Sequence, residues 1–431
     1  MKQVLIFLAI TLLLGLSDSL AQNHFYVNSQ IGSDANAGSL KSPWKTLKNV
    51  SGHSFFPGDI IHFACGSSFY GCVEVNCSGA EGLPIVFTNY GKGNVPKFNN
   101  SNFDNHCGRS FQVEGSHIMI GNLFFYDTPT PTPEKPPVDL RVSQQHKNVP
   151  NMGAVFIGKN ASNVVVENCE FSNALIGIRV RGSHSIVRHN YLHDAAKLTE
   201  QWGAIAIVIV GPFNEVAYNQ IENYGFYGGN FGMDGAAIEL DAEDHDYNAN
   251  DTYIHHNVSI NTKGGFCEIT GNADNVTLAY NYSDDIDKFV GTVGVKNLKV
   301  INNTIIRMRN PDLKQMVFWQ LDQFGKKRKS EYYLENNLIY INRNVRIYDT
   351  LDRSWGIKQQ PRKNNLYFSP DTTITSVLGL DLNPSEVVCD PEFADFKSKI
   401  YKSRISSVAL SRGIGAFTKS LPVWNAGIIK K

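Results

Sequence analysis

From about residue 118 to residue 370, short runs of alternating apolar and polar residues recur along the chain. Each run is rich in β-branched and aromatic residues, reaches an asparagine, and is followed by a polar turn and a second alternating run led by glycine. Alternation with a period of two predicts strands with one buried face. The runs that align on the asparagine are IMIGNLFFYD, VVVENCEFSN, SIVRHNYLHD, NEVAYNQIEN, TYIHHNVSIN, VTLAYNYSDD, LKVINNTIIR and YYLENNLIYI.

Several of these asparagines are 22 to 24 residues apart, with longer intervals where loops intrude. A strand-rich repeat of this length predicts a solenoid, because one repeat cannot bury its apolar side alone and stacked repeats share a continuous core. We therefore expect a parallel β-helix, in which the repeated asparagine stacks its side-chain amide on the coils above and below. The aligned positions are Asn122, Asn168, Asn190, Asn219, Asn257, Asn281, Asn303 and Asn337.

The glycine-led runs supply a second alignment: GAVFIG, GIRVRG, GAIAIV, GAAIELD and GGFCEITG. Strand side chains alternate between core and solvent, so the alignment divides the residues of these runs into a core-facing set and a solvent-facing set. The alignment directs Arg181, Ala206, Glu239 and Glu268 outward, in one column on successive coils. We expect Arg179, Asp241 and Thr270 on the same face. The residues expected to point into the core are Ile178, Val180, Ile238, Leu240, Cys267 and Ile269.

Candidate chemistry gathers around this face. Stacked Glu239 and Glu268 would repel each other unless a proton, a cation or an arginine relieves them. The loop before Gly235 carries Tyr224 and Tyr227 among glycines, a combination suited to stacking on sugar rings. The alternative is that Arg179 and Glu239 form surface ion pairs on a solvated sheet. His255 and His256 directly precede an aligned asparagine, which favours a structural role for them.

The net charge and the N-terminal sequence limit the classes of partner that we expect. The chain has 40 Lys+Arg against 40 Asp+Glu, so no net field directs it to nucleic acid. Its first residues, MKQVLIFLAITLLLGLSDSLAQ, are typical of a secretory signal peptide, and no later apolar run is long enough for a membrane span. We expect an exported, monomeric protein. Cys65, Cys72, Cys77 and Cys107 are close enough in sequence for one or two disulfides.

The segment FYVNSQIGSDANAGSLKSPWKTL resembles the opening of many exported right-handed β-helix proteins that act on polysaccharides. With the repeats, this resemblance covers about residues 24–370. It implies an all-β fold: a single right-handed parallel β-helix with end caps and long loops beside one groove. The expected division is 1–21 signal peptide, 22–117 N-terminal cap and first coils, 118–370 repeats, and 371–431 C-terminal coil and cap.

Three reactions suit the outward arginines and acids. The first is lyase-type β-elimination on a uronic-acid saccharide, releasing either a glycosidic oxygen or water. Arg179 and Arg181 would neutralise the sugar carboxylate, and His245, Lys263 or a nearby tyrosine would act as base. Glu239 and Asp241 could instead hold a Ca²⁺ ion that performs the neutralisation, since alternate strand positions share one side.

Two resemblances bear on elimination. The acid-x-acid pair resembles that of the alginate and chondroitin lyase branch, although Glu268-Ile269-Thr270-Gly271 stands where that branch has Arg-His-Gly. The run Asp244-His245-Asp246 is similar to the Asp-Pro-His-Asp motif of β-helix mannuronan epimerases.

The second reading is glycoside hydrolysis, with Glu239 or Asp241 as nucleophile and Glu268 as general acid. Retaining glycosidases need carboxyl groups about 5–5.5 Å apart, close to the spacing of adjacent coils. In this respect the chain resembles the β-helix xylosidases. The third reading, a saccharide-binding solenoid without catalysis, leaves the stacked acids unexplained. Because two outward arginines beside the acids favour an anionic sugar, elimination is the favoured prediction and hydrolysis is the alternative.

Overall fold

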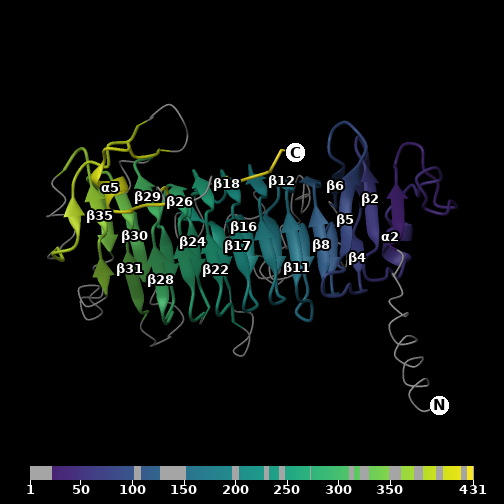
Figure 1. Cartoon of the computed structure of the whole chain (residues 1–431), viewed down its shortest axis with the longest axis horizontal. Coiled ribbons are helices and arrows are strands. Elements are labelled where there is room, and N and C mark those ends of the chain that lie inside the picture. The colour runs from purple at the N-terminus through teal and green to yellow at the C-terminus, as the bar shows by residue number, and fades with distance from the viewer. Residues whose placement is uncertain are drawn as a thin grey trace, which may run out of the picture.

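The chain winds into an elongated right-handed parallel β-helix, shown by a computed structural model (Figure 1). The structure describes residues 22–100, 108–126, 152–196, 203–227, 233–241, 248–271, 273–309, 315–320, 330–348, 361–372, 382–394, 401–418 and 425–430. Each full coil contributes one strand to each of three long sheets, here called sheets I, II and III in the order in which the chain meets them. The predicted fold is confirmed.

Sheets I and II flank the bend that carries the repeated asparagine. Sheet I contains β1 (His24–Val27), β2 (Ile60–Ala64), β5 (Ile85–Tyr90), β8 (Ile118–Gly121), β11 (Val164–Glu167), β14 (Ile186–Arg188), β17 (Glu215–Ala217), β22 (Tyr253–His255), β25 (Thr277–Ala279), β28 (Leu298–Ile301), β31 (Tyr332–Glu335) and β34 (Arg362–Lys363). Sheet II contains β3 (Ser68–Tyr70), β6 (Lys97–Asn99), β9 (Phe124–Tyr126), β12 (Glu170–Ser172), β15 (Tyr191–His193), β18 (Gln220–Glu222), β23 (Val258–Ile260), β26 (Tyr282–Asp284), β29 (Thr304–Arg307), β32 (Leu338–Ile341), β35 (Leu366–Phe368) and β36 (Val387–Val388).

Sheet III carries the candidate site. Its strands are β4 (Val73–Val75), β7 (Phe111–Val113), β10 (Val155–Ile157), β13 (Ile176–Val180), β16 (Ile205–Ile209), β21 (Ala236–Leu240), β24 (Cys267–Ile269), β27 (Val290–Thr292), β30 (Gln315–Gln320) and β33 (Val345–Tyr348). A short antiparallel hairpin, β19 (Phe226–Tyr227) and β20 (Met233–Asp234), leads into β21.

Bends between the strands use left-handed backbone. His189, Tyr218, His256 and Tyr280 have φ between 54° and 57°, and each directly precedes a stacked asparagine. Asparagine adopts this conformation more readily than most residues, which explains part of the asparagine richness of the chain. Asn122 and Asn168 also lie at this bend position, with φ of 60° and 54°. Their assignment to the amide stack was therefore wrong by one residue.

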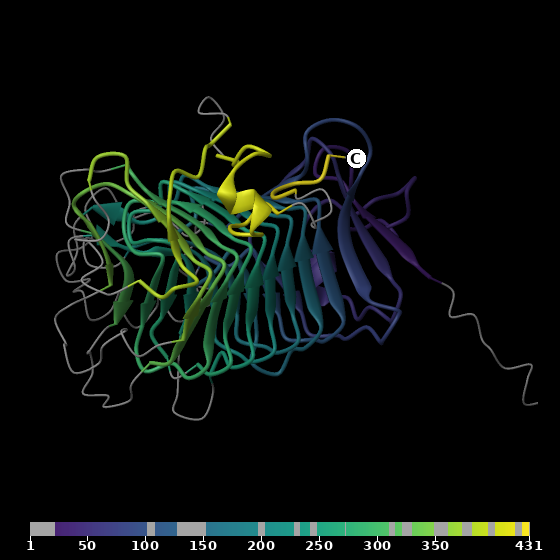
Figure 2. The same ribbon diagram turned by 60° about the vertical axis from the view of Figure 1, so that its left-hand side comes forward.

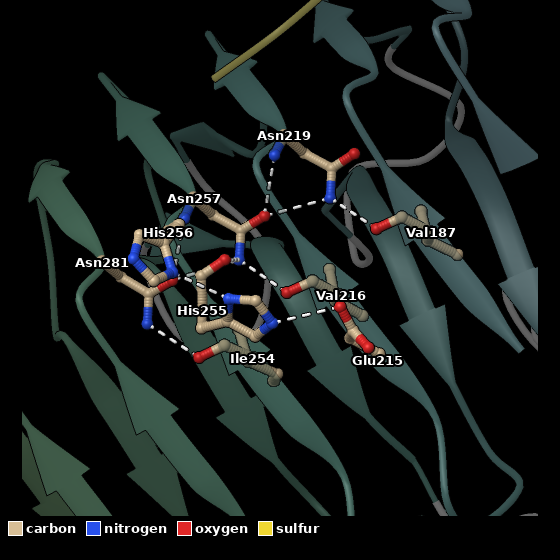
Figure 3. A network of polar contacts seen from close by, with 9 residues as sticks. All are labelled: Val187, Glu215, Val216, Asn219, Ile254, His255, His256, Asn257 and Asn281. Atoms are coloured by element: carbon tan, nitrogen blue, oxygen red, sulfur yellow. Dashed lines mark hydrogen bonds and ion pairs between the residues drawn. The ribbon is translucent and has the colours of Figure 1, made fainter. Parts of the chain in front are cut away.

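The stack itself runs from Asn190 to Asn365, so the prediction was right for six of its positions and missed the last. Asn257 shows the pattern (Figure 3): its Nδ2 donates to Val216 O at 2.8 Å and to Asn281 Oδ1 at 3.0 Å, and its Oδ1 accepts from Asn219. Each amide thus joins three coils. Cys169 occupies the preceding step, where its backbone N donates to Asn190 Oδ1.

The segments at the two ends of the described chain pack in different places. At the N-terminal end, Trp44 and Leu47 enter the core beside α2 (Lys48–Gly52). In the C-terminal segment, β36 adds a strand to the last coil beside β35, whereas residues 401–418, with α5 (Val408–Ser411), and 425–430 lie along the side of the solenoid (Figure 2). Ala416 N donates to Thr304 Oγ1, Gly427 N to Tyr218 O, and Ile429 N to Asn168 Oδ1.

The expected signal peptide and Cys107 lie outside the described residues. Cys65 and Cys77 are free thiols. In the part of the chain that the structure describes, no helix has the length and apolarity needed to cross a membrane.

Candidate functional site

One column of side chains follows the outer face of sheet III across successive coils. The strand pairings place Arg179 beside Val208, Val208 beside Glu239, and Glu239 beside Glu268. The column continues to Gly291 and Trp319 in one direction and to Phe156 and Gln112 in the other. Adjacent positions are separated by the spacing of parallel strands, about 4.8 Å.

The predicted column was wrong by two residues at its first two positions. Arg179 and Val208 occupy the places assigned to Arg181 and Ala206, whereas Glu239 and Glu268 are neighbours as predicted. The error came from aligning the glycines, which are not in register. Gly203 lies against the backbone of Asp234, where a Cβ would approach to 2.0 Å, so it marks a close contact between coils.

The core side of these strands is as predicted, since Ile178, Ile238 and Leu240 are fully buried. The outer side is less open than expected. Arg179 is 1% exposed and Glu239 is 6% exposed, and the Arg179 Nε donates to Met152 O at 3.0 Å. A buried charge is costly unless it is paired, so these groups do not form the solvated surface ion pairs considered above.

Glu239 lies in a group of acids whose mutual repulsion is strong. Burial raises its pKa well above the ordinary value, and the charges of Asp241 and Glu268 raise it further, against the opposing effects of Arg179 and a Thr270 hydrogen bond. Thr270 Oγ1 lies 3.2 Å from Glu239 Oε1 and 3.3 Å from Asp241 Oδ1. A carboxyl group in this setting is held in its protonated form above the pH at which an exposed glutamate ionises.

Glu268 has a different partner. The ammonium group of Lys288 lies 2.6 Å from Glu268 Oε1 and 3.3 Å from Asp287 Oδ2, and it donates to Gly264 O at 2.7 Å. Burial opposes the lysine charge, but the carboxylates of Glu268 and Asp287 outweigh it and raise the pKa of Lys288 above its usual value. Lys288 is therefore held in its charged form in contact with Glu268, while Glu239 next to this pair favours the neutral form.

Asp234, at the end of the hairpin, belongs to the same electrostatic environment. Burial raises its pKa, and the negative charge of Glu268 raises it further. Its Oδ1 accepts a hydrogen bond from the Gly235 backbone at 2.8 Å.

The other predicted site residues have separate outcomes. Lys263 lies at another bend: its Nζ donates to Asn261 O, and its charged neighbours are Asp285, Arg309 and Asp194 rather than the acid group. Tyr224 is fully buried in the core, so it offers no ring to a ligand. Tyr227 is 54% exposed on the hairpin and stays a candidate. His245 lies outside the described residues.

Arg181 is half-buried on the same face as Asp241. Its guanidinium lies 5.9 Å from the ring centre of Phe156, and the guanidinium of Arg109 covers that ring at 3.7 Å. The N-terminal end of the column therefore combines cations with one aromatic ring.

The sequence alignment missed Lys288 and its neighbours Asp287, Gly291 and Trp319. The signal was present in DIDKFVGTVG, where FVGT continues the glycine-containing strands by one further coil. A lysine two residues before a strand gives no indication from sequence alone that it will bend back to the preceding coil.

One alternative hypothesis was a Ca²⁺ ion held by Glu239 and Asp241. Among the described residues, no group of three or more His, Cys, Asp or Glu side chains is arranged to hold a metal ion. Ca²⁺ takes six to eight oxygen ligands, so two carboxylates would need further ones. Residues 242–247, which directly follow Asp241, lie outside the described residues, and the Ca²⁺ site stays a prediction.

His255 and His256 form a second polar cluster beside the stacked asparagines (Figure 3), and His255 is the last residue of β22 in sheet I. Their Nδ1 atoms are 2.8 Å apart, and His255 Nε2 lies 3.1 Å from Glu215 Oε1. Tyr218 and Tyr280 stack on His256, and burial, with the nearby His255 charge, lowers its pKa to about 4. A neutral, sandwiched imidazole beside the amide stack supports a structural role.

Comparison with known proteins identifies the fold. No family model and no curated protein matches the sequence. Among solved structures, XylC in complex with xylose matches with a TM-score of 0.54 and 12% identity, over 87% of this chain and 88% of that one. A rhamnogalacturonan lyase matches at 0.53 and 14%, over 87% and 91%, and the pectate lyase Pel9A at 0.51 and 15%, over 93% and 97%.

Two of these structures are named as polysaccharide lyases, and the third holds a bound sugar. The expected resemblance to right-handed β-helix enzymes that act on carbohydrate is confirmed at the level of the fold. At 12% to 15% identity the likeness shows the fold alone, and function depends on the site.

Proposed function

We propose that this protein is a carbohydrate-active enzyme that hydrolyses a glycosidic bond with Glu239 as general acid and Glu268 as nucleophile. One observation carries the proposal: of two carboxyl groups on adjacent strands, Glu239 favours the protonated form and Glu268 contacts the ammonium group of Lys288. Glycoside hydrolysis needs such a pair. These roles reverse the sequence-based assignment, which had Glu268 as the acid.

In the proposed reaction Glu268 acts as a carboxylate and Glu239 as a protonated acid. The Glu268 carboxylate forms a bond to the anomeric carbon as the Glu239 proton passes to the glycosidic oxygen, which leaves as an alcohol. The Glu239 carboxylate then takes a proton from water, and the water oxygen displaces Glu268 from the sugar. The spacing of adjacent strands, about 4.8 Å, suits the retaining form of this mechanism.

Elimination on a uronic-acid saccharide, the favoured sequence-based prediction, is the second candidate. Arg181, with Arg179 near it on the same sheet, favours it, because cations would neutralise a sugar carboxylate. Among the described residues its weakness is the base: Lys263 lies elsewhere, and Lys288, which does reach the acids, is held in its charged form. His245, the other predicted base, lies outside the described residues.

The test is incubation of the purified protein with neutral and uronic-acid-containing oligosaccharides. Hydrolysis predicts new reducing ends without an unsaturated product, and retained anomeric configuration by proton NMR. E239Q and E268Q are each expected to lower kcat by about 100-fold or more, while Glu74→Gln, far along the same face, serves as the matched control. Ultraviolet absorbance from an unsaturated sugar would instead establish elimination.

Azide separates the two carboxyl roles. In E268A, added azide is expected to attack the anomeric carbon and yield a glycosyl azide, because the acid is still present. In E239A the Glu268 nucleophile can still form the sugar–enzyme bond, and azide then displaces Glu268 from the sugar. Because the general acid is missing, only substrates whose leaving group needs no proton would benefit. Equal behaviour of the two variants would contradict the assignment.

A further inference from the structure

Gly291 creates an opening in the column beside Glu268. It occupies the outward position of β27 between Glu268 and Trp319. A Cβ at this position would lie 2.9 Å from both Cδ and Cε of Lys288. The lysine side chain therefore passes through space that any other residue at 291 would fill.

The end of that side chain is enclosed. The lysine side chain is 3% exposed, and its ammonium contacts Glu268, Asp287 and the Gly264 carbonyl. The ring of Trp319 lies 5.1 Å from Nζ, on the next coil. Two carboxylates, a carbonyl and an aromatic face thus surround one cation, which leaves it a single well-defined position.

The backbone that precedes Lys288 is fixed from sheet II. Arg307 is fully buried, and its guanidinium donates to the carbonyls of Asp287 and Ser283 and to Ser283 Oγ. Asp285, also fully buried, accepts from Ser259 Oγ and Thr262 N at 2.9 Å. This network holds the turn between β26 and β27, so the lysine starts from a rigid base.

We propose that Lys288 is a positioning residue for the hydrolysis proposed above: by crossing the face of Gly291, it fixes Glu268 as a carboxylate beside Glu239. The inference rests on that proposed function. Among the described residues, the charged and titratable groups around Glu268 are Asp234 from β20, Glu239 from β21, Cys267 on its own strand, and Asp287 and Lys288 from the turn before β27. Lys288 is the cation of this set, so its removal leaves Glu268 among acids and a buried thiol.

The experiment compares K288M, K288R and G291A with the wild type by the pH dependence of kcat/KM. Its acidic limb reports ionisation of the nucleophile in the free enzyme. In K288M this limb is expected to move to higher pH by roughly 1 to 3 units, the usual effect of losing a close opposite charge. G291A keeps the lysine but displaces it, so a shift in the same direction is expected. K288R should restore most of the wild-type profile.

A second measurement does not depend on activity. The ¹³C NMR signal of the Glu268 carboxyl, assigned by its loss in E268Q, should titrate at higher pH in K288M and G291A than in the wild type. Circular dichroism checks that each variant is folded. If K288M does not fold, G291A alone provides the test of the lysine position.

The outcomes are separable. If folded G291A and K288M keep the wild-type carboxyl titration and acidic limb, the role of Lys288 is overturned. If the titration moves as expected but the wild type cleaves no saccharide, the proposed function falls and the control of Glu268 by Lys288 is upheld. If cleavage occurs and the titration does not move, the proposed function stands and the lysine inference falls.

Discussion

Glu239 and Glu268 are the same residue type on neighbouring strands, but their surroundings differ. Val208 lies beside Glu239, whose charge is opposed by burial and by two acids and favoured by Arg179, whereas Glu268 contacts the ammonium group of Lys288. Alternation along the strands predicted that both would point away from the core. It could not predict which of them would meet Lys288, because that contact depends on a turn from the next coil.

The raised pKa of Glu239 has a consequence for stability. Because the folded protein binds this proton more tightly than the unfolded chain does, the free energy of unfolding should fall as the pH rises from about 4.5 through the folded-state pKa. In E239Q this fall should be smaller, so the variant should gain stability relative to the wild type at pH 8 and not at pH 4. Urea unfolding at both pH values measures it, and an identical pH profile for the two proteins would contradict the prediction.

His256 predicts the opposite dependence on the acid side. Its pKa is lowered to about 4 in the fold, so the unfolded chain takes up its proton first as the pH falls from 6.5. Stability from this group is complete above pH 6.5 and is lost on the way to pH 4, by up to about 3 kcal/mol. Chemical unfolding of H256N, which keeps a residue suited to left-handed backbone, should show a smaller loss over this range than the wild type.

At the scale of the element, the asparagine stack explains why the repeat could be read from the sequence. Its period reflects a real hydrogen-bonded column, and only the first two positions were misread, since Asn122 and Asn168 satisfy the bend instead. The glycines of sheet III carry no such shared contact. They occur wherever two backbones approach, so their alignment misplaced Arg181 and Ala206.

N257D tests the stack with a nearly isosteric change. A carboxylate can accept from Asn219 but cannot donate to Val216 O, and it would face Asn281 Oδ1. The expected loss is about 2–4 kcal/mol of unfolding free energy, from buried groups left without partners. N275D, at an exposed bend, is the control and should lose less than half as much. Equal losses would mean that the amides act only through bend conformation.

At the scale of the whole molecule, the C-terminal segment connects coils that are distant in sequence. Residues 401–418 contact sheet II near Thr304 and Tyr282, and residues 425–430 reach Tyr218 and Asn168 (Figures 1 and 2). The sequence indicated that the repeat ends near residue 370 but not where the remaining chain would lie, because that path depends on contacts across up to 261 residues.

Removing residues 401–431 should therefore affect one side of the solenoid. Amide hydrogen exchange is expected to rise in β26, β29 and β32, which lose covering contacts, and to stay unchanged in β2, β5 and β8. The full-length protein under the same conditions is the reference. A uniform rise in all coils would show instead that the segment stabilises the solenoid as a single cooperative unit.

The constant step between coils has a further meaning for any ligand that lies along the axis. Successive strands of sheet III place a different side chain about every 4.8 Å along the axis. In order these are the Phe156 ring, the Arg179 cation, the hydrocarbon of Val208, and then the two acids. Phe156, Arg179 and Val208 are at most 2% exposed, so a linear saccharide would meet the column from Glu239 towards Trp319, one strand at a time. The length of the saccharide and the positions of its charges would then decide which of its units lies beside the two acids.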